Sequence, residues 1–95
     1  MSNTDRDFVL QSVGRREILE QIAEEASELA QSALKVIRAE GISDNPTTVS
    51  ASKAIEDFRE ELTDVIMCAS AVVDINSLNW MNSPKWTRWK KRLQS

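Results

Sequence analysis

The chain has 95 residues, with 15 acidic and 12 basic side chains, a formal net charge of −3 and no histidine. A domain of this length buries only about 60–65% of the surface of its unfolded chain, so we expect a second copy to complete its core. The negative charge argues against a partner that is a nucleic-acid polymer, because such binding requires a basic face for the phosphates.

Cys68 is the only cysteine of the chain, so no internal disulfide forms, and a reducing, cytoplasmic setting is expected. The longest nearly apolar segment, residues 65–73, is much shorter than the roughly 20 residues of a membrane-spanning helix. We therefore expect a cytoplasmic protein with no membrane partner.

The first half of the chain predicts one long helix. Residues 1–14 form an N-terminal arm with a helical turn or two, and residues 15–40 follow as a helix that Gly41 ends. Residues 41–50 are rich in Gly, Pro, Asn, Asp, Ser and Thr, so they are expected to form a loop.

The second half repeats this pattern with a helix over residues 51–76, followed by a short C-terminal helix over residues 83–94 that begins with Ser83 and Pro84. Alternating strand patterns are absent from the sequence, so the fold class is all-α. We expect a single domain in which an antiparallel helical hairpin plus the short C-terminal helix completes a helical bundle by oligomerisation, as a homodimer or homotetramer.

Each long helix carries one apolar stripe whose residues are spaced by three and four. The first stripe comprises Ile18, Ile22, Ala26, Leu29, Ala33 and Ile37, and the second comprises Ile55, Phe58, Leu62, Val65, Ala69 and Val72. The two stripes are expected to pack against each other in the hairpin.

An acidic motif occurs once on each helix. The segment EEASE begins at Glu24 and the segment EELTD begins at Glu60, so an offset of 36 residues aligns every acid of one with an acid of the other. At about 100° per residue, Glu25 lies about 60° and Glu28 about 120° from Ile22 in the first stripe. The second motif has the same relation to its own stripe, so both motifs lie on matching flanks.

Packing of the stripes is expected to bring four carboxylates together at the edge of the core, those of Glu25, Glu28, Glu61 and Asp64. Two unit charges about 5 Å apart repel by roughly 3 kcal/mol at an effective dielectric constant near 20, so a cation is expected among them. Oxygen ligands without histidine or cysteine favour Mg²⁺, with Mn²⁺ as the other possibility. The alternative is that all these acids are solvated helix surface.

The two acidic segments resemble the paired EExxE and ExxD motifs of the MazG-like all-α nucleoside triphosphate pyrophosphohydrolases, which are related to dimeric dUTPases and phosphoribosyl-ATP pyrophosphohydrolase. The resemblance covers about residues 15–73, and 32 residues separate Glu28 from Glu61, more than is usual between these motifs. It implies that Glu25, Glu28, Glu61 and Asp64 hold Mg²⁺. The substrate would be a nucleoside or deoxynucleoside triphosphate, cleaved between its α and β phosphates to the monophosphate and pyrophosphate. Glu28 or Glu24 would orient or deprotonate the attacking water.

Two lysines near the acidic motifs have two interpretations. Lys35 lies on the flank of Glu28 two turns later, and Lys53 lies two turns before Glu60. Either lysine is able to contact substrate phosphate, and the alternative for each is a surface ion pair, which the sequence favours slightly.

The C-terminal segment combines tryptophans with basic residues. We expect Trp86, Trp89 and Leu93 to pack on the bundle as the apolar face of a short helix. Contacts with a nucleobase or phosphate, or with a membrane surface, are the alternatives. For the whole protein, the alternative to an enzyme is a non-catalytic helical interaction module with solvated acidic faces.

Overall fold

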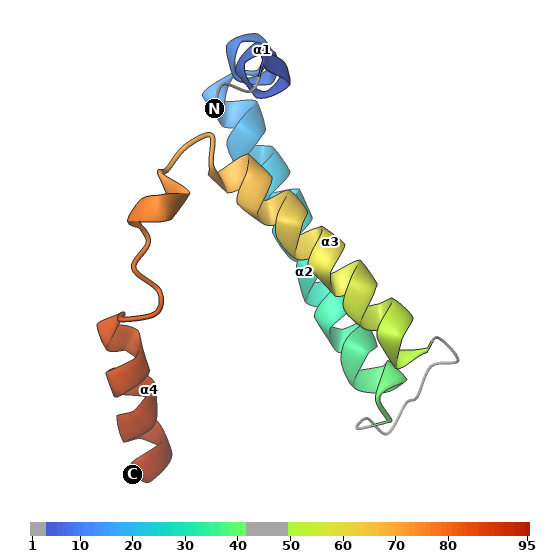
Figure 1. Ribbon diagram of the computed structural model, residues 1–95, viewed down its shortest axis with the longest axis vertical. Helices are drawn as coiled ribbons and strands as arrows, with labels where there is room; N and C mark the ends of the chain where they lie inside the picture. The colour runs from blue at the N-terminus through green and yellow to red at the C-terminus, as the bar shows by residue number, and fades with distance from the viewer. Residues whose placement is uncertain (1–3, 42–49) are drawn as a thin grey trace.

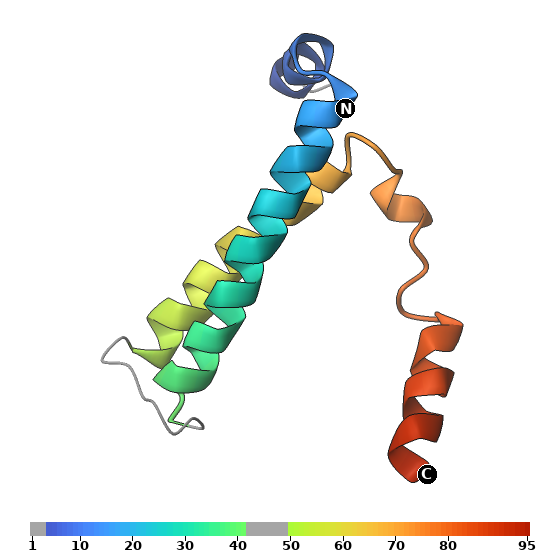
Figure 2. The same ribbon diagram turned by 180° about the vertical axis from the view of Figure 1, so that it is seen from behind.

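Two long antiparallel helices dominate the computed structural model, which describes residues 4–41 and 50–95. Helices α2 (Arg15–Ala39) and α3 (Ala51–Ala69) lie side by side in both views (Figures 1 and 2). The short helix α1 (Thr4–Ser12) precedes them, and the 3₁₀ turn η1 (Ile75–Ser77) and helix α4 (Pro84–Gln94) follow. The described residues contain no strand, which confirms the prediction of an all-α hairpin with a short C-terminal helix.

Local capping interactions set most helix ends. Gly41 has a positive φ of 73°, the left-handed conformation that ends many helices, immediately after α2. The Ser50 hydroxyl accepts a hydrogen bond from the backbone N–H of Lys53 at 3.2 Å and caps α3. Ser83 caps α4 in the same way, through the N–H of Lys85. These predicted boundaries are confirmed, whereas loop residues 42–49 lie outside the described residues.

Helix α3 is shorter than predicted. The prediction extended it to residue 76, but it ends at Ala69. The guanidinium of Arg6, from α1, donates a hydrogen bond to the carbonyl oxygen of Ser70 at 3.1 Å, so this carbonyl is engaged where the next helical turn would need it. The Ser70 hydroxyl also donates to the carbonyl of Met67 at 2.6 Å, a local bond that competes with helix continuation.

The closest packing of the two helices lies beside the apolar stripes. The fully buried residues are Ser32 and Ala54, whereas Ile37, Ile55 and Leu62 in the stripes remain 39%, 40% and 39% exposed. Eight of the twelve stripe residues are half-buried, so the stripes face the seam in part. Small side chains at the contact allow a close approach of the two helices, and this line brings the acidic flanks into the seam between them.

Helix α4 lies apart from the hairpin in both views (Figures 1 and 2). Its side chains Trp86 and Trp89 are 51% and 52% exposed, so they do not pack on the hairpin of their own chain, and their packing on a bundle of several copies stays a prediction. The radius of gyration is 16.9 Å, compared with about 12 Å for a compact domain of this length. Among the described helices, none is both long and apolar enough to cross a membrane.

Candidate functional site

Three of the predicted metal ligands meet in the seam of the hairpin. Glu25 and Glu28 project from α2, and Glu61 projects from α3. One carboxylate oxygen from each residue lies within 4.8 Å of the corresponding oxygens of the other two. The spacing of three residues places the first two carboxylates on one flank of α2. The antiparallel neighbour α3 then supplies the third. We call these three residues the carboxylate cluster.

Part of the carboxylate cluster is buried without a partner. One oxygen, Oε2, of Glu25 and of Glu61 is shielded from solvent and accepts no hydrogen bond from any residue that the structure describes. The other oxygen of Glu25 accepts a hydrogen bond from Nε2 of Gln21 at 2.8 Å. Buried carboxylate oxygens without donors are costly, because they lose their hydration. A positively charged ligand in the seam would remove this cost.

Glu28 completes the carboxylate cluster from its exposed side. Its pKa is raised, first by the negative charge of Glu25 and next by that of Glu61. Within residues 4–41 and 50–95, no lysine or arginine forms an ion pair with any of the three acids. Among the described residues, the repulsion inside the cluster is therefore not offset by a positively charged side chain.

The other two predicted acids, Asp64 and Glu24, lie outside the carboxylate cluster. Asp64 is half-buried but is not part of the group of mutually close oxygens in the described structure. Its charge, together with that of Glu25, helps to raise the pKa of the Cys68 thiol, which burial raises most. Glu24 is exposed, and its charge makes only the smallest contribution to the raised pKa of Glu28.

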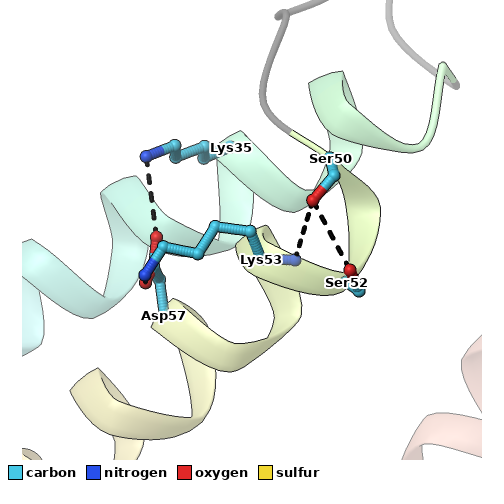
Figure 3. Close-up of polar contacts among 5 residues, drawn as sticks. All are labelled: Lys35, Ser50, Ser52, Lys53 and Asp57. Atoms are coloured by element: carbon cyan, nitrogen blue, oxygen red, sulfur yellow. Dashed lines mark hydrogen bonds and ion pairs between the residues drawn. The ribbon is translucent and has the colours of Figure 1, made fainter.

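The two predicted lysines converge on one aspartate (Figure 3). The Nζ atom of Lys53 lies 2.9 Å from Oδ1 of Asp57, and that of Lys35 lies 3.7 Å from Oδ2, so the aspartate links α2 to α3. The pKa of Asp57 is lowered, mainly by its hydrogen bond with Lys53. Both lysines thus form ion pairs with Asp57, and their contact with substrate phosphate stays a prediction. Asp57 was not identified as their partner from the sequence, although the spacing of four from Lys53 was a signal for it.

Polar residues therefore continue along the seam from one site to the next. Asp57 lies one helical turn before Glu61 on α3, and Lys35 lies two turns after Glu28 on α2. The seam thus carries a negative cluster and, next to it, two cations around one aspartate.

Comparisons with protein-family models, with curated proteins and with solved structures find no match for this chain.

Proposed function

We propose that this protein is a Mg²⁺-dependent nucleotide pyrophosphohydrolase, which hydrolyses a nucleoside or deoxynucleoside triphosphate to the monophosphate and pyrophosphate. The observation that carries the proposal is the carboxylate cluster, in which two of the three acids hold a buried oxygen without a hydrogen-bond donor among the described residues. The likeness of EEASE and EELTD to the MazG-like motifs supports the same function.

The donor set of the cluster fits a hard divalent cation. All three groups offer carboxylate oxygens, which are the ligands that Mg²⁺ and Mn²⁺ prefer. The neighbouring Cys68 is a weak competitor for a softer metal, because its raised pKa keeps the thiol protonated. A bound Mg²⁺ supplies positive charge for the triphosphate and acidifies a coordinated water. In this proposal Glu25, Glu28 and Glu61 hold the cation, and Asp64 joins them after a small rearrangement.

In this proposal, other functions of the site, namely activation of the water and binding of phosphate, are carried out by acidic and basic side chains of the chain. Glu28 is exposed at the outer side of the cluster, where its carboxylate is accessible to a water that it orients or deprotonates in this proposal. Glu24, one turn earlier, is the other candidate for this role. Lys53 and Lys35 lie beside the cluster, and in this proposal they exchange their contact with Asp57 for substrate phosphate.

The same proposal includes self-association of the hairpin. The chain exposes 7875 Å², whereas a compact monomer of its mass, 10.7 kDa, exposes about 5500 Å². The excess of about 2400 Å² per chain is in the range that an obligate homodimer buries on each subunit. The uncovered halves of the apolar stripes, including Leu62 and Ile66, provide the surface for a bundle of two hairpins.

The test is a panel of the common nucleoside and deoxynucleoside triphosphates with Mg²⁺, with the products identified. We expect pyrophosphate and the monophosphate from at least one substrate, and loss of turnover by orders of magnitude in Glu25→Gln and Glu61→Gln. Glu56→Gln is the matched control, because this acid is exposed and lies outside the cluster. Release of orthophosphate instead, or activity that both cluster variants retain, would contradict the proposal.

The exposed apolar stripes favour a second candidate, a non-catalytic interaction module. Ile55, Leu62 and Ile66 present a continuous apolar row on α3 that another helix is able to cover. Such a module has no need of a cation. A melting temperature that does not change on addition of Mg²⁺ would favour this function over the enzyme.

A further inference from the structure

An apolar groove opens between α1 and the end of the hairpin. It has a volume of about 620 Å³, and its apolar lining comes from α1, the start of α2 and the end of α3 with the residues after it. These lining residues are Val9, Leu10, Val13, Ile18, Met67 and Ala71. We call this feature the α1 groove. The volume is in the range of sites that hold several side chains or a small ligand.

The apolar face of α4 has the shape that such a groove accepts. Trp86, Trp89 and Leu93 are exposed and spaced as i, i+3 and i+7, so they follow one side of the helix. The two indole rings stack with their centroids 5.9 Å apart and their planes inclined by 6°. Helices with this spacing of large apolar residues bind grooves through these residues as anchors.

The segment between α3 and α4 holds α4 away from its own groove. The carboxylate of Asp74 accepts a hydrogen bond from the N–H of Asn76 at 3.0 Å and caps η1. The indole Nε1 of Trp86 donates to the carbonyl of Trp80 at 2.6 Å, which fixes the start of α4 against the preceding turn. From there α4 runs away from the α1 end of the hairpin (Figures 1 and 2). Docking within one chain would require the segment between α3 and α4 to take a different course from the one in this structure (Figures 1 and 2).

The charges of the two features are complementary. Helix α4 carries five of the chain's twelve basic residues and no acid, namely Lys85, Arg88, Lys90, Lys91 and Arg92. All 15 acids lie in the rest of the chain with the other seven basic residues. The charged residues that line the α1 groove are Asp5, Glu17 and Arg6, so the lining has a net charge of −1, which is complementary to a basic helix.

We propose that α4 of one copy docks in the α1 groove of a second copy, with its tryptophans as anchors. A two-fold symmetric pair makes this exchange reciprocal, so each copy gives one helix and receives one. The exchange accounts for the exposed tryptophans, the open groove and part of the excess exposed area. It is independent of the proposed hydrolysis, because none of the residues involved belongs to the carboxylate cluster.

The test uses Cys68, which lines the α1 groove and is the chain's only cysteine. Full-length wild-type chain is mixed with a chain that carries Cys68→Ser and either Lys90→Cys or Leu93→Cys, and the mixture is oxidised. In this mixture no single chain has cysteines both at position 68 and on α4. Any disulfide between these two positions therefore joins two copies. We expect a covalent heterodimer whose linked peptides are identified by mass spectrometry. The control is Cys68→Ser with Glu56→Cys, at the opposite end of α3.

Two results would overturn the exchange. One is a yield of the link between copies no higher than in the Glu56→Cys control. The other is a chain with Cys68 and Leu93→Cys together that forms its link within a single copy. The first result, together with binding of the wild-type chain to anionic lipid vesicles or to single-stranded DNA, would instead assign α4 to a membrane or a nucleic acid.

A second measurement does not depend on disulfide geometry. The double variant Trp86→Ala and Trp89→Ala is expected to weaken self-association on the order of tenfold or more in sedimentation. Helicity by circular dichroism reports whether the hairpin stays folded, and it should, because α4 lies apart from α2 and α3. Thr87→Ala is the matched control, because this exposed residue lies on the same helix outside the apolar face and carries no charge. An unchanged dissociation constant in the folded double variant would contradict the proposal.

Discussion

Glu25 and Glu61 occupy equivalent places in two helices. They are separated by the 36 residues that align the acidic motifs, both are half-buried, and each has its Oε2 shielded without a donor among the described residues. The duplication of the motif is therefore also a duplication of environment. Glu28 differs, because it remains exposed and takes its raised pKa from the charges of the other two. The cluster thus has two half-buried members, Glu25 and Glu61, and one exposed member, Glu28.

Replacing Glu28 by Gln should change the pH dependence of stability in the absence of metal. The pKa of Glu28 is higher in the folded protein than its ordinary value, so its favourable contribution is complete below that ordinary value and is lost as the pH rises through the raised pKa. Glu28→Gln removes this loss. We expect a higher melting temperature than wild type at neutral pH and a smaller difference at acid pH, measured by thermal unfolding. Glu56→Gln should follow wild type at every pH, and a Glu28→Gln curve that does the same would contradict the repulsion.

Asp57 predicts the opposite pH dependence. Its pKa is lowered by Lys53 and, less strongly, by Lys35, so its contribution is present above its ordinary pKa and is lost as the pH falls through the lowered value. Asp57→Asn should therefore lower the melting temperature at neutral pH and have little effect at strongly acid pH. Glu20→Gln is the matched control, since its ion pair with Arg16 lies within one exposed helix surface. An equal effect of Asp57→Asn at both pH values would rule out the ion pairs as its cause.

At the scale of elements, a helix end could be predicted where the residues beside it in the sequence determine it. A helix end with contacts to residues far away in the sequence could not be predicted. Ser50 and Gly41 act within a few residues of their own helix ends, so their types identify those ends. Helix α3 ends beside Ser70, whose carbonyl accepts a hydrogen bond from Arg6, a residue 64 positions away. Sequence periodicity contains no information on that contact.

The line of closest packing and the place of α4 could not be predicted for a related reason. Periodicity shows which side of each helix is most apolar, but the fully buried residues are the small Ser32 and Ala54 beside that side. Three of the four predicted acids, Glu25, Glu28 and Glu61, nevertheless lie close together, because the two motifs stand on matching flanks of antiparallel helices. Apolar residues on α4 predicted burial, which its own chain does not provide.

Gly41→Ala tests the helix stop after α2. The residue has a φ of 73°, and a Cβ there would meet no atom within 4 Å, so the cost is that of the backbone conformation alone. We expect the free energy of unfolding to fall by about 1 kcal/mol in chemical denaturation. Gly41→Asn is the matched comparison, because asparagine adopts the left-handed conformation more readily than alanine. If Gly41→Asn costs as much as Gly41→Ala, the left-handed conformation is not the cause.

At the scale of the whole molecule, the protein lacks a core of its own. No large side chain among the described residues is fully buried, and the surface exceeds that of a compact monomer of the same mass by about 2400 Å². We propose that association covers this apolar surface and so stabilises the hairpin, including the seam that contains the carboxylate cluster.

We therefore expect a dimer or tetramer at micromolar concentration in light scattering. Ile66→Glu should shift the equilibrium to monomer and lower the melting temperature, because it places a charge in the exposed apolar row of α3. Thr63→Glu introduces the same charge at an exposed polar position of the same helix and should leave the assembly unchanged. A monomeric wild-type chain would contradict self-association.

The most direct test of the account is a calorimetric titration of the metal-free protein with Mg²⁺, performed on the wild type and on Glu25→Gln and Glu61→Gln. These two residues hold the shielded oxygens, and each substitution keeps the side-chain size while removing one charge of the proposed ligand set. The account predicts saturable binding to the wild type that both variants lose, and unchanged binding to Glu56→Gln. Absence of binding to the wild type, or affinity that both cluster variants retain, would contradict a cation site in the seam.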